Sequence, residues 1–157
     1  MAPDFTAMNQ VRWIRITMFP GTGLVEPSMA RVASERERMK DLPYVMDQPR
    51  QECVLGSIKQ HCAFRCWPLY AVHVRTNHVH AVVEAPAPPE KVLNEIKAYA
   101  SRALNDAGLD TPDRRRWSRH GSTRYLWKRD EVDAAIAYVA DQQGEPMAIY
   151  VNGEVSW

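Results

Sequence analysis

The segment from Tyr70 to Glu84 constrains the fold more than any other part of this chain. It predicts a strand over 67–74, a turn over 75–77 and a returning strand over 78–84. His78 and His80 lie two positions apart in the second strand, so both side chains point to the same face of the sheet. Two imidazoles side by side on one sheet face are a natural pair of ligands for a divalent metal.

Hydrophobic periodicity and breaker residues predict the remaining elements. The alternating segment 11–19 predicts a strand, and 125–127 and 149–151 predict two short strands. Helices are expected over 34–39, 47–61, 90–107 and 131–142, the last with Asp130 as its N-cap. The polar, basic segment 109–125 predicts an irregular loop. This order indicates an α+β sandwich with a mainly antiparallel sheet and helices packed on one face, the metal site lying on or beside the other.

Length and composition indicate a single globular domain over 1–157, with its core over about 10–146. The 157 residues are 45% hydrophobic and 25% charged, and no apolar run of about 18 residues predicts a membrane span. Net charge is only +1, but ten basic and four acidic residues lie between Lys91 and Arg129. That asymmetry suits a phosphate-bearing partner, although a solvated loop with salt bridges would give the same pattern.

The three cysteines are Cys53, Cys62 and Cys66. An odd number at close spacing does not indicate a secreted disulfide framework, so we expect reduced cysteines that mainly pack, with zinc binding as the alternative. The first residues lack the basic and then apolar character of a signal peptide, and we expect a cytoplasmic protein.

The predicted last helix carries a second candidate group. Tyr138 and Gln142 are four residues apart and share one side of the helix, about a quarter turn from the apolar stripe. Tyr138 is therefore expected at the edge of the core, and Gln142 would bring an amide oxygen to the same place.

Four segments together resemble the small HUH-type tyrosine transposases, and most closely their REP-associated and insertion-sequence-like group. The segment Arg75-Thr-Asn-His78-Val-His80 resembles the histidine strand, and Lys97-Ala-Tyr-Ala-Ser101-Arg102 resembles the helix after it. Trp117-Ser-Arg-His-Gly121 resembles the tryptophan-centred loop, and Tyr138-Val-Ala-Asp-Gln142 resembles the tyrosine helix. The loop residues His120-Gly-Ser-Thr123 depart from the aromatic-rich version common in the family, which is compatible with altered target recognition or a domesticated relative.

The resemblance implies a ferredoxin-like fold and metal-dependent cleavage and rejoining of single-stranded or hairpin DNA. Tyr138 would be the nucleophile and form a 5′-phosphotyrosine. His78, His80 and Gln142 would hold Mg²⁺ or Mn²⁺. The family also implies a possible homodimer, in which the tyrosine helix of one subunit serves the histidines of another.

Several residues are candidates for DNA binding. These are Lys97, Ser101, Arg102, Arg114, Arg115, Arg116, Trp117 and Arg119. The arginines would follow the phosphates, and Trp117 or Trp127 would stack on an unpaired base. Each has a structural alternative: solvated charges for the cations, core packing for the tryptophans.

Three other functions stay open at this point. A non-catalytic module of the same fold, including a domesticated one, would bind single-stranded nucleic acid by stacking and phosphate contacts alone. A metal-dependent phosphoesterase would use water instead of tyrosine. A structural protein would carry the histidine pair incidentally. His73 is expected to be structural or to support the ligands, and Tyr99 is expected to pack in the core.

Overall fold

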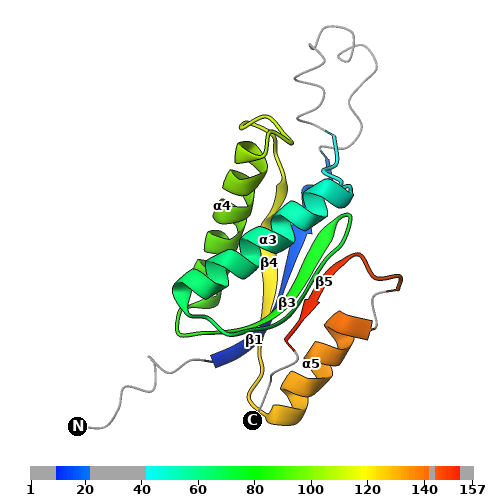
Figure 1. Ribbon diagram of the computed structural model, residues 1–157. Helices are drawn as coiled ribbons and strands as arrows, with labels where there is room; N and C mark the ends of the chain where they lie inside the picture. The colour runs from blue at the N-terminus through cyan, green and yellow to red at the C-terminus, as the bar shows by residue number, and fades with distance from the viewer. Residues whose placement is uncertain (1–9, 22–41, 142–143, 153–157) are drawn as a thin grey trace, which may run out of the picture.

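The computed structural model describes residues 10–21, 42–141 and 144–152, and within them it contains five strands and three helices (Figure 1). In chain order these are β1 (Gln10–Met18), α3 (Gln48–Arg65), β2 (Leu69–Val74), β3 (His78–Ala85), α4 (Pro89–Asp106), β4 (Trp117–Tyr125), α5 (Arg129–Asp141) and β5 (Ala148–Val151).

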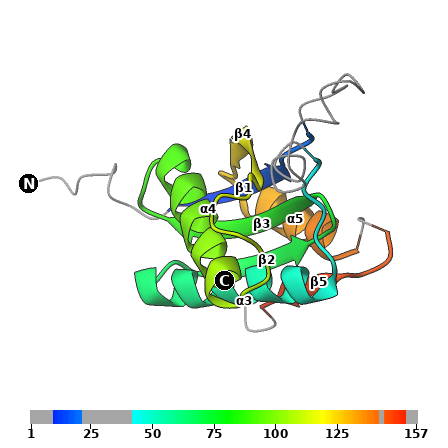
Figure 2. The ribbon, with the colours of Figure 1, turned by 90° about the horizontal axis from the view of Figure 1, so that it is seen from above.

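The five strands form one antiparallel sheet in the order β4-β1-β3-β2-β5. The β2–β3 hairpin closes as predicted, with the Arg75 N–H donating to the carbonyl of His78 at 2.9 Å. Long helices α3 and α4 cover one face, and α5 lies on the other, as Figure 2 shows from above. The α+β fold class with a mainly antiparallel sheet is confirmed. The expectation that the helices pack on one face holds for α3 and α4 but not for α5, whose buried valines pack on the histidine face.

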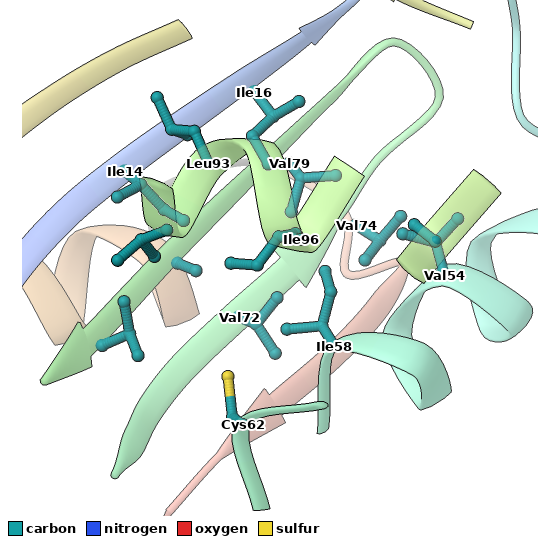
Figure 3. Packing of buried hydrophobic residues seen from close by; sticks show 14 of the residues in the cluster. Ile14, Ile16, Val54, Ile58, Cys62, Val72, Val74, Val79, Leu93 and Ile96 are labelled. Atoms are coloured by element: carbon teal, nitrogen blue, oxygen red, sulfur yellow. The ribbon is translucent and has the colours of Figure 1, made fainter. Parts of the chain in front are cut away.

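The main core lies between the sheet and the α3–α4 layer. Alternate residues of β1 and β3, such as Ile14, Ile16 and Val79, point into it (Figure 3). Val54 on α3 and Ile96 on α4 meet them from the helical side. Because strand side chains alternate, the residues between these positions face α5, and this is the face that carries His78 and His80.

A smaller apolar cluster attaches α5 to that second face. Val132 and Val139 are buried against Ala71 of β2 and Val82 of β3, together with Leu126. These apolar contacts cover only part of the sheet. The histidines lie on the polar part of the same face, next to the C-terminal half of α5.

Local signals set the ends of the two long helices. The Asp47 side chain accepts a hydrogen bond from the Arg50 N–H as the N-cap of α3, and Cys66 ends that helix with a left-handed φ of 58°. Pro89 begins α4, and Gly108 follows its end with a φ of 70°. The predicted ends of α4 agree with the structure to within one residue, and α3 extends four residues beyond its predicted end.

The prediction of an irregular loop over 109–125 is wrong for its second half. Residues 117–125 form β4, an outer strand that pairs with β1. The sequence of this strand is polar because its outer position in the sheet leaves many of its residues exposed, so the hydrophobic pattern typical of a strand is absent. Gly121 is required there by close packing: a Cβ would lie 2.8 Å from the Arg15 carbonyl oxygen and 3.1 Å from Leu93 Cδ1.

Smaller differences concern the ends of elements. Helix α5 begins at Arg129, so Asp130 lies in its first turn, where a carboxylate favours the helix dipole. The strand predicted over 125–127 contributes only Tyr125, to β4, whereas the predicted edge strand 149–151 is confirmed as β5. The helix predicted over 34–39 and the residue Gln142 lie outside the described residues.

Two sequence expectations concern the cysteines and membranes. The three cysteines are free thiols, and burial raises the pKa of Cys62 to about 12, which keeps that thiol protonated. Among the described residues, no helix combines the length and the apolar character needed to cross a membrane.

Candidate metal and nucleophile site

His78 and His80 are brought together on the α5 face of the sheet. Their ring centroids are 4.8 Å apart, with the rings nearly perpendicular. His78 Nδ1 lies 2.7 Å from Asn77 Oδ1, and because an amide oxygen only accepts, this bond requires the proton on Nδ1. The lone pair of His78 is then on Nε2. A metal bound there would have an imidazole oriented by its neighbour in the chain.

His80 is buried and electrostatically kept neutral. It is 3% exposed, and burial, followed by the charges of His78 and Arg15, lowers its pKa to about 4. Its Nδ1 is buried without a hydrogen-bond partner among the described residues. A neutral imidazole with an unpartnered buried nitrogen suits a ligand or a bound polar group better than a packing role.

These observations fit a divalent metal held in part by the histidine pair. Imidazole nitrogens suit Mn²⁺ and related ions better than Mg²⁺, which prefers oxygen ligands. Within the described residues, no group of three or more His, Cys, Asp or Glu side chains is arranged to hold a metal. An additional ligand would therefore have to be another residue type, water or substrate, and the predicted ligand Gln142 lies outside the described residues.

Tyr138 of the same chain reaches the histidine pair. Its ring centroid lies 5.7 Å from that of His80, and the residue is 42% exposed. The neighbouring Val139 is buried in the small apolar cluster, so Tyr138 lies at the edge of the core, as its helical position predicts. The phenol is therefore both close to the candidate metal ligands and accessible to a substrate.

His73 of β2 connects the sheet to the end of α5 and to the segment that follows this helix. Its Nδ1 lies 3.3 Å from the carbonyl oxygen of Val139, and its Nε2 accepts the Met147 N–H at 2.9 Å. Both ring nitrogens are thus engaged, with the proton on Nδ1, and burial and the charge of Arg75 lower its pKa. His73 therefore fixes the last turn of α5 and the following chain to β2, which supports the structural role expected for it.

Arg15 lies beside the candidate site and was not predicted from the sequence. It is opposite His80 in the β1–β3 register and opposite Ser122 in the β1–β4 register. Residues directly opposite each other in an antiparallel pair share a face, so the exposed Arg15 side chain lies on the histidine face. The alternation of Trp13, Arg15 and Thr17 in β1 contains this signal, but the pairing partner is not visible in the sequence.

The predicted arginine cluster divides between the interior and the surface. Arg116 is buried, and its guanidinium bonds to Asp110 at 3.3 Å and to Asn105 at 2.5 Å. The structure thus gives Arg116 a role within the fold. Arg119 is exposed on β4.

The other two arginines of the cluster lie on aromatic rings near the end of β1. Arg114 lies over the Tyr44 ring and donates to the carbonyl oxygens of Leu42 and Pro43. Arg115 is exposed, and its guanidinium lies 4.4 Å from the centroid of the Phe19 ring.

The candidate DNA-binding residues of α4 do not form one surface. The Ser101 hydroxyl accepts the Trp117 indole N–H at 2.7 Å, and Lys97 donates to the Ser118 carbonyl at 3.3 Å. These contacts attach one side of α4 to β4 and hold Trp117 in place. Arg102 lies on another side of the helix, over the ring of Tyr99. Tyr99 in turn stacks on His61 at 4.1 Å, in line with its expected packing role.

Comparisons with known proteins extend the fold assignment. No protein-family model matches the chain, and no curated protein matches it in sequence. Among solved structures, it is similar to a REP-associated tyrosine transposase bound to a REP hairpin, with a TM-score of 0.51 and 10% sequence identity. The match covers 84% of this chain and 65% of that chain. This likeness shows a shared fold, and this chain spans less than two thirds of the neighbour's length.

Proposed function

We propose that this protein cleaves and rejoins single-stranded DNA through Tyr138, with a divalent metal held by His78, His80 and Gln142. One observation carries the proposal: the Tyr138 ring lies 5.7 Å from the ring of His80, beside the histidine pair and on an exposed part of α5. A tyrosine with only a packing role would be expected among the apolar residues that attach α5 to the sheet. Tyr138 instead lies beside the two histidines, on a part of the sheet face that these apolar contacts do not cover.

The chemistry of the residues gives a balanced reaction. The Tyr138 Oη forms a bond to the phosphorus of the scissile phosphodiester as the bond from phosphorus to the 3′ oxygen breaks. The phenol loses its proton and the departing 3′ oxygen gains one. The product is a 5′-phosphotyrosine and a free 3′-OH, and attack by a second 3′-OH reverses the step and rejoins the strand.

The proposed Mg²⁺ or Mn²⁺ would polarise a non-bridging phosphate oxygen and orient the phosphodiester. His78 and His80 would supply nitrogen lone pairs for it, and Gln142 would supply an amide oxygen. Arg15, opposite His80 in the sheet, would pair with the phosphate as a fixed cation. Among the residues predicted to bind DNA, Arg102, Arg115 and Arg119 are exposed enough to follow a DNA backbone, whereas Arg116 is buried.

Hairpin DNA is the proposed substrate, supported by the fold neighbour, which is bound to a hairpin. The distance between Tyr138 and His80 within one chain favours an active site built from a single subunit. A homodimer remains compatible with this arrangement, since each subunit would then carry its own complete site.

Covalent capture tests the proposal. The protein is mixed with 5′- and 3′-labelled hairpin oligonucleotides from the DNA that flanks its gene, with Mn²⁺ or Mg²⁺, and resolved on denaturing gels. We expect a metal-dependent adduct carrying the DNA 3′ of the cut, absent in Tyr138→Phe and in His78→Ala. Tyr99→Phe is the matched control, because it removes the hydroxyl of a tyrosine that stacks in the α3–α4 layer, and it should still form the adduct.

Other results would favour the alternatives. DNA binding without any adduct, in protein that is folded by circular dichroism, would support a non-catalytic single-strand binding module. Cleavage that persists in Tyr138→Phe would point to a water nucleophile and a metal-dependent phosphoesterase. An adduct that survives in Tyr138→Phe but disappears in Tyr99→Phe would move the nucleophile to α4.

A further inference from the structure

A hollow beside Tyr138 is not used by the proposed chemistry. It has a volume of about 600 Å³ and lies between α5 and the paired strands β1 and β4. Trp13 and Arg124, which are opposite each other in the β1–β4 register, line its sheet side. Asp130, Glu131 and Tyr138 line its helix side. Its size is within the range of about 300–1,000 Å³ typical of small-ligand pockets.

The hollow adjoins the candidate active site through two of its lining residues. Tyr138 lines it and also contacts His80, at 5.7 Å between ring centroids. Trp13 lines it as well, and its ring lies 5.2 Å from that of His80. A nucleotide joins its base to its phosphate through one sugar. A phosphate held between Tyr138 and the histidines would therefore bring a neighbouring base to the mouth of this hollow.

The lining suits a planar base and excludes a phosphate. Trp13, Leu126 and the short side chains Ala134 and Ala135 give an apolar surface with room for a flat ring. Two carboxylates of α5 repel a phosphate and accept hydrogen bonds from amino groups. Asp130 and Glu131 would weaken the binding of DNA if it depended on phosphate contacts alone. Their position is explained if the two carboxylates accept hydrogen bonds from the edge of a base.

Two side chains that line the hollow, Trp13 and Arg124, carry hydrogen-bond donors. The Trp13 indole Nε1 is buried and has no hydrogen-bond partner among the described residues. The Arg124 guanidinium is largely exposed and lies 3.9 Å from the Glu131 carboxylate, a weak ion pair that a ligand can replace. Acceptors and donors thus meet around an apolar surface, as in sites that read an unstacked base.

We propose that this hollow binds the nucleobase next to the scissile phosphate, and that Asp130 and Glu131 select bases with an exocyclic amino group over thymine. Adenine, cytosine and guanine each offer an amino group to a carboxylate, and thymine has none. This inference rests on the proposed function, because the scissile phosphate defines which base enters. It makes α5 a specificity element as well as the carrier of the nucleophile.

Binding, measured separately from cleavage, tests the inference. Hairpin oligonucleotides carry each of the four bases, or an abasic residue, on either side of the scissile phosphate. Their affinities for Tyr138→Phe protein are measured by fluorescence anisotropy at fixed salt. At one of the two positions we expect amino-bearing bases to bind at least about fivefold more tightly than thymine or the abasic residue, because an unpaired carboxylate is left with thymine.

The double variant Asp130→Asn/Glu131→Gln should reduce this ratio to less than about twofold. The ratio between bases is the readout, because removing two negative charges also strengthens binding to every oligonucleotide. Asp133→Asn is the matched control: Asp133 is exposed on the same helix and does not line the hollow, so the ratio should be unchanged.

Equal affinity for all bases and the abasic residue at both positions would overturn the inference, as would a base preference that the double variant leaves intact. These outcomes are separable from the proposed function. A covalent adduct without base preference retains the nuclease and rejects the pocket. Base preference without any adduct retains the hollow as a site that binds a base and rejects cleavage of the neighbouring phosphate.

Discussion

Asp110 connects Tyr44 and Arg50, which lie near the start of α3, with Arg116, which directly precedes β4. Its carboxylate accepts the Tyr44 hydroxyl at 2.5 Å, Arg50 Nε at 3.1 Å and Arg116 Nε at 3.3 Å. The side chains of Arg116 and Asp110 are 3% and 10% exposed. Burial and the hydrogen bond to Asp110 raise the pKa of Tyr44, so its hydroxyl remains a donor. Asp110 is therefore the group that compensates the buried charge of Arg116.

Asp110→Ala is expected to lower the free energy of unfolding by about 3 kcal/mol, because it leaves the Arg116 guanidinium buried without a counter-charge. Urea denaturation followed by circular dichroism measures this. Asp106→Ala provides the comparison, since Asp106 is exposed at the end of α4, and its loss should cost less than about 0.5 kcal/mol. Similar losses in the two variants would contradict the role given to Asp110.

At the scale of elements, β4 shows how a polar segment becomes a strand. Pairing with β1 satisfies its backbone, and Gly121 allows the close approach to the Arg15 carbonyl and to Leu93 of α4. The pairing also has a consequence for the candidate site, because it puts Ser122 beside Arg15 and Arg124 beside Trp13. Any shift of β4 would change the hollow next to Tyr138.

Two glycines allow a matched test of this packing. Gly121→Ala should lower the free energy of unfolding by about 1–3 kcal/mol, since its Cβ would overlap backbone as well as side-chain atoms. Gly56→Ala adds the same methyl group to α3, where nothing lies within 4 Å, and should raise that free energy by about 0.5–1 kcal/mol. Chemical denaturation gives both values. A neutral Gly121→Ala would mean that β1 and β4 can separate without cost.

At the scale of the whole molecule, the α3–α4 layer contains a buried histidine. His61 stacks on Tyr99 at 4.1 Å and meets Trp67 edge-on at 5.4 Å. Its Nε2 lies 3.2 Å from Glu95 Oε1, and Arg65 also binds Glu95. Burial lowers the pKa of His61, although the Glu95 carboxylate acts in the opposite direction.

This arrangement predicts the sign of a pH dependence. A histidine whose pKa is lower in the folded state binds protons more readily when unfolded, so its contribution to stability is lost as the pH falls below about 6.5. His61→Phe should therefore reduce the decrease in unfolding free energy between about pH 7.5 and about pH 5.5. Denaturation curves at both pH values test this. An unchanged pH dependence in the variant would show that the Glu95 charge cancels the effect of burial on the His61 pKa, and a steeper one would show that it outweighs burial; either would contradict the prediction.

The sequence alone determined the features that depend on one continuous segment. Strand alternation puts His78 and His80 on the same face, and the helical repeat puts Tyr138 at the edge of the α5 core. The β2–β3 turn and the end of α4 follow from local residues as well. Strands and helices have fixed periods of two and 3.6 residues, so the face on which a side chain lies can be predicted without knowing what packs against the segment. The roles assigned to the histidines, Tyr138 and Gln142 remain predictions.

Only the tertiary structure decided which segments meet. It makes a strand of residues 117–125, puts Arg116 in the interior and puts Arg15 opposite His80. The hollow beside Tyr138 likewise arises between α5 and two strands that are distant in the chain. The physical reason is that burial, hydrogen-bond pairing and charge compensation depend on partners far away in sequence, and no local period encodes the register that brings those partners together.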